Sequence, residues 1–347
     1  MKSRFLLLLL IFILCTFFSV TATISNAASK PIVWKFQIAF PGPLWEGEIA
    51  KLAKMIKTNT QGRVIFKTFS AGAILKAPKI LNGVAQRVVE AGGVANVYFA
   101  GKIPEIILIQ GVPFLYDNVD QIIENIYEYK EGEIYKIVKE VFAKKGKVLY
   151  LGLGQTSSNG LFGNFPVTSS ADIKGKKIRS TGLGSALVKF LGASPVRLPG
   201  SEQYTAFQRG TIDGTVFPFR AIRDYKLFEV VKYMIMPPFY PGGEFGIIAN
   251  RDAYNELSPA DRKIVSDTCL EWSKNIFTND MKKVDVEYLA WIQKHGVKKQ
   301  QLPEQEVVRL KKAVIEKILP PYINKTPECK RIWELMEGYA KEKGLLK

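Results

Sequence analysis

Histidine is almost absent from this sequence, which has one, His295, in 347 residues. Ser–His–Asp or Cys–His catalysis would have to use it, and no G-x-S-x-G turn is present to hold a nucleophile. The zinc pattern H-E-x-x-H needs two histidines and is excluded. His295 stands beside Lys294 at the end of a helical pattern, where a surface position is expected. No spacing of carboxylates singles out an acid/base pair, so we expect no enzyme and no cofactor. We assign no metal-site residues, and the sequence leaves a bound metal open.

Nucleotide-binding loops are missing as well. Gly152-Leu153-Gly154 follows a predicted strand, but the third glycine of the dinucleotide fingerprint is absent, and so is the lysine pattern of a phosphate-binding loop. Cysteine is scarce, with Cys15, Cys269 and Cys329. In an exported protein the last two could form a disulfide. Two cysteines alone do not show one, so both outcomes stay open.

Long apolar runs are absent after the first residues. Lys2 and Arg4 precede an apolar run over residues 5–20, and small and polar residues follow. This order is typical of a secretory signal peptide, and its small residues predict cleavage after Ala27. A retained anchor is the alternative, although the run is short for a bilayer helix of roughly 20 apolar residues. Cys15 lacks the small neighbours of a lipoprotein site. We therefore expect a soluble protein of the periplasm.

Acidic residues are outnumbered, with 32 Asp and Glu against 49 Lys and Arg and a net charge of +17. Such a charge attracts anionic partners. The basic residues are scattered, with short clusters such as Lys174–Lys177, and none alternates with aromatic residues as a base-stacking surface would. We expect no nucleic-acid partner. A solvated basic face is the alternative to anion attraction.

Strand and helix patterns alternate along the chain, which is longer than one hydrophobic core usually organises. Ile32–Ala39 and Val64–Phe69 read as strands, with a helix that begins near Trp45 between them. This order predicts two α/β lobes with mostly parallel sheets. Further strands are predicted at 87–91, 147–152, 176–180, 196–198, 215–217 and 245–250, and further helices at 77–85, 119–145, 185–191 and 202–209.

One predicted helix is unusually long. Ser258 and Pro259 are a strong helix start, a capping hydroxyl followed by a proline in the first turn. Apolar residues then recur at helical spacing until Gly296, and no further proline interrupts them. At 1.5 Å per residue such a helix reaches roughly 55 Å, more than one small lobe needs. It would brace two lobes, unless it breaks midway.

Four segments follow one another in the middle of the chain: Asp172–Arg179 (DIKGKKIR), Gly192–Val196 (GASPV), Ser201–Gln208 (SEQYTAFQ) and Gly210–Gly214 (GTIDG). In this order they resemble a known family, the DctP-type periplasmic solute receptors of tripartite ATP-independent periplasmic (TRAP) transporters. Other segments fit the same order: Gly62-Arg63-Val64, Val112–Leu115 and Tyr225–Tyr233. The resemblance covers nearly the whole chain after the signal peptide.

The resemblance implies a two-lobed α/β fold of the periplasmic-binding-protein type, with the long helix spanning both lobes. After a signal peptide at 1–27, we expect lobe I at 28–156 and 244–285 and lobe II at 157–243 and 286–347. The function implied is that of a monomeric receptor that captures a small carboxylate between its lobes and delivers it to TRAP membrane subunits. A ligand-presenting receptor for a membrane sensor is the alternative, and a secreted hydrolase or lyase on the same scaffold is less favoured.

The resemblance also assigns the central binding residue. In the family, the arginine that ends the D-x-K-G-x-K-x-R strand pairs with the ligand carboxylate, and that position is Arg179. The chemistry is reasonable because the planar fork of a guanidinium matches a carboxylate in a bidentate pair. A surface arginine on a basic strand is the alternative.

Several positions depart from the family pattern. A Glu-Asn pair often follows the Asp-Gly turn, but here Val216 and Phe217 replace it. Asn159 stands where an upstream arginine is often found, and Gln86–Glu90 replaces a Gly-x-x-Asp segment. Fewer charges and more aromatic surface favour an acid with an apolar or aromatic body over a sugar acid. Phe217 is equally well read as a core residue.

The remaining candidates for ligand binding rest on position, because ligands bind beside strand ends in open α/β sheets. They lie after the first predicted strand, after the third, and near the return to lobe I. Core packing is the alternative for at least half of them, Trp45 above all. These candidates are Phe40, Trp45, Glu46, Asn96, Tyr98, Tyr240 and Glu244.

Overall fold

The computed structural model of the protein describes residues 30–346, and two β-sheets form its framework. The first has five strands in the order β2-β1-β3-β10-β4 and the second has six in the order β11-β9-β5-β8-β6-β7. The strands of the first sheet are β1 (Ile32–Ile38), β2 (Val64–Phe69), β3 (Ala91–Val94), β4 (Leu149–Thr156) and β10 (Gly243–Ala249). Those of the second are β5 (Asn159–Gly163), β6 (Lys177–Arg179), β7 (Ser194–Val196), β8 (Gly214–Pro218), β9 (Tyr233–Tyr240) and β11 (Lys298–Gln301).

Both sheets are mixed rather than mostly parallel as predicted. Strand β10 is antiparallel to β3 and β4, and β5 is antiparallel to β8 and β9. The other pairings are parallel. The cause is the way the chain changes sheets, from β4 to β5 through residues 157–158 and from β9 to β10 through residues 241–242. These links are too short for a helix that would turn the chain back into a parallel strand.

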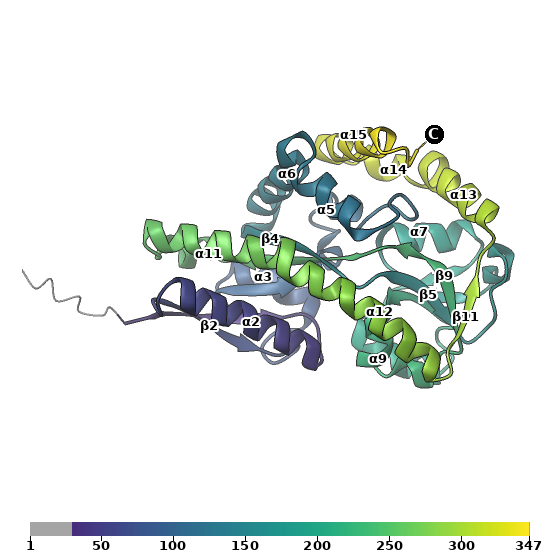
Figure 1. The fold of residues 1–347 in the computed structure, drawn as a ribbon, viewed down its shortest axis with the longest axis horizontal. Coiled ribbons are helices and arrows are strands. Elements are labelled where there is room, and N and C mark those ends of the chain that lie inside the picture. The colour runs from purple at the N-terminus through teal and green to yellow at the C-terminus, as the bar shows by residue number, and fades with distance from the viewer. Residues whose placement is uncertain (1–29, 347) are drawn as a thin grey trace, which may run out of the picture. The chain divides into compact units, whose positions relative to one another are not determined.

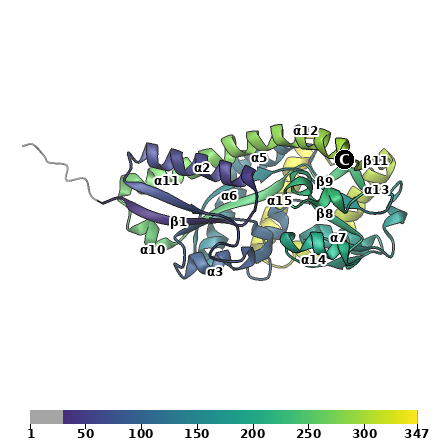
Figure 2. The same ribbon diagram turned by 90° about the horizontal axis from the view of Figure 1, so that it is seen from below.

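Helices cover both faces of each sheet. Figure 2 shows α2 and α11 on one face of the first sheet and α3 on the other. The helices before the second sheet are α2 (Pro43–Asn59), α3 (Ile80–Ala85), α4 (Ile106–Ile109), α5 (Val119–Tyr127) and α6 (Glu133–Val141). The later ones are α7 (Gly182–Phe190), α8 (Gln203–Gln208), α9 (Phe219–Asp224), α10 (Arg251–Asn255), α11 (Pro259–Glu271), α12 (Thr278–Lys294), α13 (Glu304–Ala313), α14 (Pro320–Ile323) and α15 (Pro327–Glu342).

The predicted long helix is present. Helices α11 and α12 join through a π-helical segment, Trp272–Phe277, so the helical path does not end between them. The hydroxyl of Ser258 accepts the backbone N–H of Asp261, as the predicted cap requires. Helix α11 packs against α2 and β4, and α12 packs against α9 beside the second sheet (Figure 1). The α/β class, the two sheets and the spanning helix confirm the predicted fold.

The Gly152-Leu153-Gly154 segment serves the packing of this helix. A Cβ atom on Gly152 would collide with the hydroxyl of Ser273, and one on Gly154 would lie 2.7 Å from the Ser273 carbonyl oxygen. Glycine is therefore needed where the π-helical turn lies close against β4. The Gly-Leu-Gly pattern, which resembles part of a nucleotide-binding loop, therefore allows the helix to lie close to β4.

The C-terminal helix contacts α14, its neighbour in sequence, and also helices from a distant part of the chain. Helix α15 lies against α4, α5 and α6, all within the segment that the predicted boundaries place in lobe I, whereas α15 itself belongs to predicted lobe II. Those boundaries stay a prediction. The predicted signal peptide, with its cleavage after Ala27, lies outside the described residues.

Two observations concern the chemistry of the chain as a whole. Cys269 and Cys329 are buried free thiols, so the structure pairs neither with the other. Within residues 30–346, no helix has both the length and the apolar character that crossing a bilayer requires.

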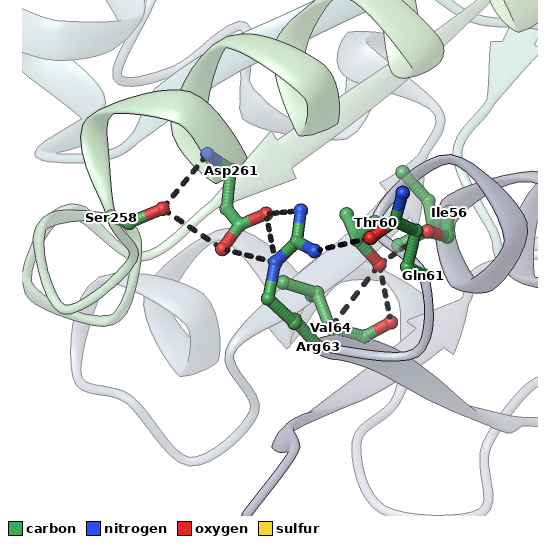
Figure 3. Close-up of polar contacts among 7 residues, drawn as sticks. All are labelled: Ile56, Thr60, Gln61, Arg63, Val64, Ser258 and Asp261. Atoms are coloured by element: carbon green, nitrogen blue, oxygen red, sulfur yellow. Dashed lines mark hydrogen bonds and ion pairs between the residues drawn. The ribbon is translucent and has the colours of Figure 1, made fainter. Parts of the chain in front are cut away.

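The Gly62-Arg63-Val64 segment follows α2 in the chain, and its arginine side chain contacts the start of α11 (Figure 3). Arg63 forms an ion pair of 2.9 Å between Nη2 and Oδ1 of Asp261, and the Ser258 hydroxyl donates to the other carboxylate oxygen at 2.9 Å. Next to it, the buried hydroxyl of Thr60 donates to the Ile56 carbonyl at 2.6 Å and accepts the Val64 N–H at 3.2 Å. This turn therefore fixes the end of α2 and the start of β2.

We predict that Thr60→Val destabilises the protein although it preserves the shape of the side chain. The change leaves the buried N–H of Val64 without its acceptor, which typically costs about 1–3 kcal/mol. Urea unfolding measures the loss, and Thr60→Ser, which keeps the hydroxyl, should lose clearly less. Equal stability of Thr60→Val and wild type would contradict the assigned role.

Candidate functional site

A cavity of about 80 Å³ lies between the two sheets, beside the carboxyl ends of β1, β3, β6 and β8. Its volume exceeds the roughly 10–15 Å³ that one water molecule needs, so a small solute fits. Residues from the first sheet and its helices line one side: Ala39, Phe40, Ala95, Val97, Tyr98, Gln110, Thr156, Gly243 and Glu244. Residues from the second line the other: Asn159, Arg179, Thr181, Val216, Phe217, Pro218, Arg220, Ala221, Tyr225 and Tyr240.

Arg179 places a positive charge in this cavity. It is the last residue of β6, and its side chain is almost fully buried, at 3% exposure. Its Nε donates to the Leu198 carbonyl at 3.3 Å and its Nη1 to the Val216 carbonyl at 3.5 Å. The guanidinium carbon lies 4.8 Å from the centre of the Phe217 ring. Two long bonds to carbonyls and one aromatic face thus hold the fork in place.

The charge of Arg179 has no acidic partner within residues 30–346. Burial lowers the pKa of its guanidinium, and the phenols of Tyr98 and Tyr225 oppose this effect. An arginine nevertheless stays protonated in proteins, and it has five N–H donors, of which the carbonyls occupy two. The remaining donors can bind a planar anion.

Arg220 is the second arginine of the cavity, and its charge is compensated. It is 1% exposed and forms an ion pair of 2.5 Å with Asp224, four residues on in α9. Its guanidinium carbon lies 4.6 Å from the ring of Trp45 and 5.9 Å from that of Phe40. Its Nε has no hydrogen-bond partner among the described residues. Arg220 therefore links α9, beside the second sheet, to the aromatic residues beside the first.

Glu244 is the one carboxyl group that lines the cavity among the described residues. It is 6% exposed and accepts hydrogen bonds from the backbone N–H groups of Asn96, at 2.9 Å, and Val97, at 3.1 Å. Burial raises the pKa of Glu244 to about 8, although these two bonds act in the opposite direction. Glu244 is therefore largely neutral at pH 7 and does not cancel the charge of Arg179.

Aromatic rings form much of the remaining wall. Phe217 contacts Tyr225 edge to face, with ring centres 5.4 Å apart. The Tyr240 hydroxyl is buried without a hydrogen-bond partner among the described residues, and burial raises its pKa, so it stays protonated. The cavity thus combines one uncompensated cation with apolar surfaces and a free hydroxyl.

The structure brings together seven of the ten predicted site residues: Arg179, Asn159, Phe217, Phe40, Tyr98, Tyr240 and Glu244 line the cavity. Their contact with a ligand stays a prediction. The half-buried Asn159 begins β5, and its amide donates to the Ser157 carbonyl at 3.2 Å. Tyr98 lies in the short helical turn after β3.

The other three predicted residues do not line the cavity. Trp45 lies behind Phe40, with the two rings stacked at 4.2 Å, because it begins the apolar stripe of α2. Glu46 is exposed and accepts a hydrogen bond from Ser70 at 2.7 Å. Asn96 is buried and donates to the Tyr150 hydroxyl at 2.7 Å. Their side chains support the fold around the site.

A comparison with known protein families tests whether the protein is a solute receptor, as the sequence predicts. The sequence profile of the bacterial extracellular solute-binding protein family 7, DctP, matches residues 37–322. The protein belongs to this family. The match confirms the resemblance read from the Asp172–Gly214 region and identifies the protein as a solute receptor of the TRAP type.

A similar curated member of the DctP family is a monocarboxylate 2-oxoacid-binding periplasmic protein of Nostoc sp. It is 26% identical over 330 residues, which cover 93% of this chain and 88% of that protein. Among solved structures, a TRAP periplasmic solute-binding protein of Desulfovibrio salexigens with bound orotic acid has a TM-score of 0.81 at 22% identity, covering 91% of this chain and 100% of that one. The DctP7 receptor of Bordetella pertussis, which binds pyroglutamic acid, has a TM-score of 0.79 at 20% identity and covers 88% and 99%.

Sequence reasoning missed some lining residues of this DctP-family site. Arg220 carried a usable signal, because Pro218 ends β8 and starts α9, and the first turn after such a strand lies at the ligand-binding edge. Gln110 and Thr181, which share a hydrogen bond of 3.1 Å, carried none. Both stand at helix ends that only the tertiary structure brings together.

We predict that the stability of the protein depends on pH through Glu244. A raised pKa means that the folded protein binds a proton that the unfolded chain releases, so wild type loses stability as the pH rises from about 4.5 to about 8. Glu244→Gln removes this dependence, and the variant should gain on wild type across that range in thermal unfolding. The exposed Glu46→Gln is the matched control. A constant difference between wild type and Glu244→Gln at every pH would rule out a neutral Glu244.

Proposed function

We propose that the protein binds a small monocarboxylate in the cavity between its sheets, with Arg179 as the anchor of the carboxylate group. Binding of the ligand would involve no chemical step and need no general base, because the protein would capture the ligand and deliver it unchanged. His295, the one histidine of the sequence, is exposed and stacks on Trp291 at 3.6 Å outside the cavity.

The observation that carries this proposal is the uncompensated charge of Arg179. A buried cation without a partner is costly, since its water is lost and nothing replaces it. A bound carboxylate would supply the missing charge, and the guanidinium fork would hold both of its oxygens. Because Glu244 is largely neutral and Arg220 is paired with Asp224, the cavity has room for a single negative charge.

The walls of the cavity favour a ligand with a planar or apolar body. The rings of Phe40, Phe217 and Tyr225 offer surfaces on which a planar or apolar body can stack. The free hydroxyl of Tyr240 and the amide of Asn159 offer donors for one further oxygen. The 2-oxoacids, orotic acid and pyroglutamic acid named for the related proteins are consistent with this class.

Two contacts across the cavity support closure around the ligand. The Gln110 amide donates to the Thr181 hydroxyl at 3.1 Å, from the end of α4 to the start of α7. Arg220 stacks on Trp45 from the opposite side. We expect both contacts to break when the lobes open, with movement at the links of residues 157–158 and 241–242 and in the long helix.

The cellular setting belongs to the same proposal. Related proteins are named periplasmic, and we expect the same compartment here after cleavage near Ala27. A monomer would deliver its carboxylate to the membrane subunits of a TRAP transporter.

We predict that Arg179→Ala weakens binding of a cognate acid at least thirtyfold. Loss of one partner of a buried charged pair costs about 2 kcal/mol or more, and about 1.4 kcal/mol corresponds to tenfold in Kd. Arg179→Lys, which keeps the charge but loses the fork, should fall between. Isothermal titration with pyruvate, pyroglutamate and orotate measures the change after a thermal-shift screen; at a hundredfold excess over Kd, a ligand stabilises wild type by about 2.7 kcal/mol.

The matched control is Arg209→Ala, which removes the same charge from an exposed position outside the cavity. It should bind as wild type does. The neutral amide of each acid should fail to stabilise wild type. Equal affinity of Arg179→Ala and wild type for the same acid would refute the anchor role.

A further inference from the structure

Two open grooves lie beside the cavity on the protein surface. The inner groove, of about 490 Å³, shares Val97, Tyr98 and Thr181 with the cavity wall. The outer groove, of about 950 Å³, shares Arg197, Tyr322 and Lys325 with the inner groove. The shared residues place the inner groove against the cavity wall and the outer groove next to the inner one.

The charges along these grooves all have the same sign. Lys189, Arg197, Lys317 and Lys325 line the outer groove, and Arg197 and Lys325 also line the inner one. All four are exposed. No aspartate or glutamate lines either groove, and none of the four forms an ion pair within the described residues. We call these four residues the basic path.

Two of the four cations lie over aromatic rings, Lys317 at 6.0 Å from the centre of the Phe190 ring and Lys325 at 5.1 Å from that of Tyr322, but ion pairing does not account for the arrangement. Like charges that gather on one surface repel each other, and many cations elsewhere on the chain have acidic partners, as in the pairs Lys282–Asp120 and Lys343–Glu124. A merely solvated basic face would not have to lie beside the ligand cavity. Arg197 also precedes Leu198, whose carbonyl accepts the bond from Arg179 Nε, so one segment serves the path and the anchor.

The outer groove lies between elements that pack against each other near the second sheet. Its walls come from α7, from β7 and from the π-helical segment Val314–Ile318 with α14. Helix α7 packs against both β7 and that segment, and α14 packs against the segment. None of its lining residues comes from the strands of the first sheet.

We propose that the basic path is an outer, low-affinity anion site that captures the carboxylate ligand and raises its rate of arrival at Arg179. This inference rests on the function proposed above. Cations that line a groove raise the local concentration of an anion and can increase association rates tenfold or more at low salt. The exposed path binds weakly because water screens it, and the buried anchor binds tightly because water is excluded. The path therefore affects arrival and the anchor affects retention.

Stopped-flow mixing with pyruvate and orotate, followed by intrinsic tryptophan fluorescence, tests the proposal. The association rate constant of wild type should fall steeply between 10 and 300 mM NaCl, because the screening length drops from about 30 Å at 0.01 M to about 8 Å at 0.15 M. The double variant Lys189→Gln/Lys317→Gln should associate several-fold more slowly at 10 mM and depend less on salt. Its dissociation rate constant should match wild type, since neither residue lines the cavity.

The matched control is Lys54→Gln/Lys57→Gln, which removes the same charge from exposed positions of α2 that line neither groove. It should associate nearly as fast as wild type. Equal association rates of the two double variants, or a change confined to the dissociation rate, would overturn the capture role alone. If wild type bound none of the acids in the screen above, the proposed function and this inference would both fail.

Discussion

The candidate site depends on a positive charge that is held away from water and has no acidic side chain beside it among residues 30–346. Arg179 is fixed by two carbonyl oxygens and the face of Phe217, none of which neutralises it. The neighbouring groups keep this imbalance: burial keeps Glu244 largely protonated at neutral pH, and Asp224 is already paired with Arg220. A bound carboxylate would supply the negative charge that the described side chains around Arg179 do not provide.

Much of the fold could be predicted because its signals are local. The start of the long helix at Ser258, its unbroken apolar spacing and the strand at Val64–Phe69 all depend on neighbours in the sequence. The strands that were not predicted depend on pairing with residues distant in the sequence. Strand β9 contains Pro237 and Pro238, and β5 is a short segment with glycines at both Gly160 and Gly163, so neither shows the alternation of a strand. With these two strands missed, the antiparallel return between the sheets was missed as well. Strand β3 begins at Ala91, later than predicted, because Arg87 adopts a left-handed turn, with φ 57°, before it.

Some residues of the candidate site could also be predicted from the sequence, whereas others could be found only in the tertiary structure. Arg179 could be placed because a motif of eight residues ends on it, and Phe40, Tyr98 and Tyr240 because they stand beside strand ends. Position alone could not tell which side of a strand end a residue faces. Trp45 is adjacent to the site in sequence, yet its ring packs under Phe40, since the helical period that begins at Trp45 turns it inward. Gln110 and Thr181 needed the tertiary structure, because their contact joins the ends of two helices separated by seventy residues of chain.

The high net charge, which the sequence left open between anion attraction and a solvated face, gains a physical interpretation from its distribution. Cations that form no ion pair within residues 30–346 line the grooves beside the cavity, and many others, such as Lys282 and Arg331, are matched by nearby acids. Salt weakens the long-range attraction exerted by exposed cations, but it has little effect on a buried contact such as that with Arg179. The two interactions therefore have different consequences. The first governs how often an anion arrives, and the second governs how long it stays. A receptor that must collect a dilute acid and then release it to a partner benefits from separating the two, because the arrival rate can increase without making release slower.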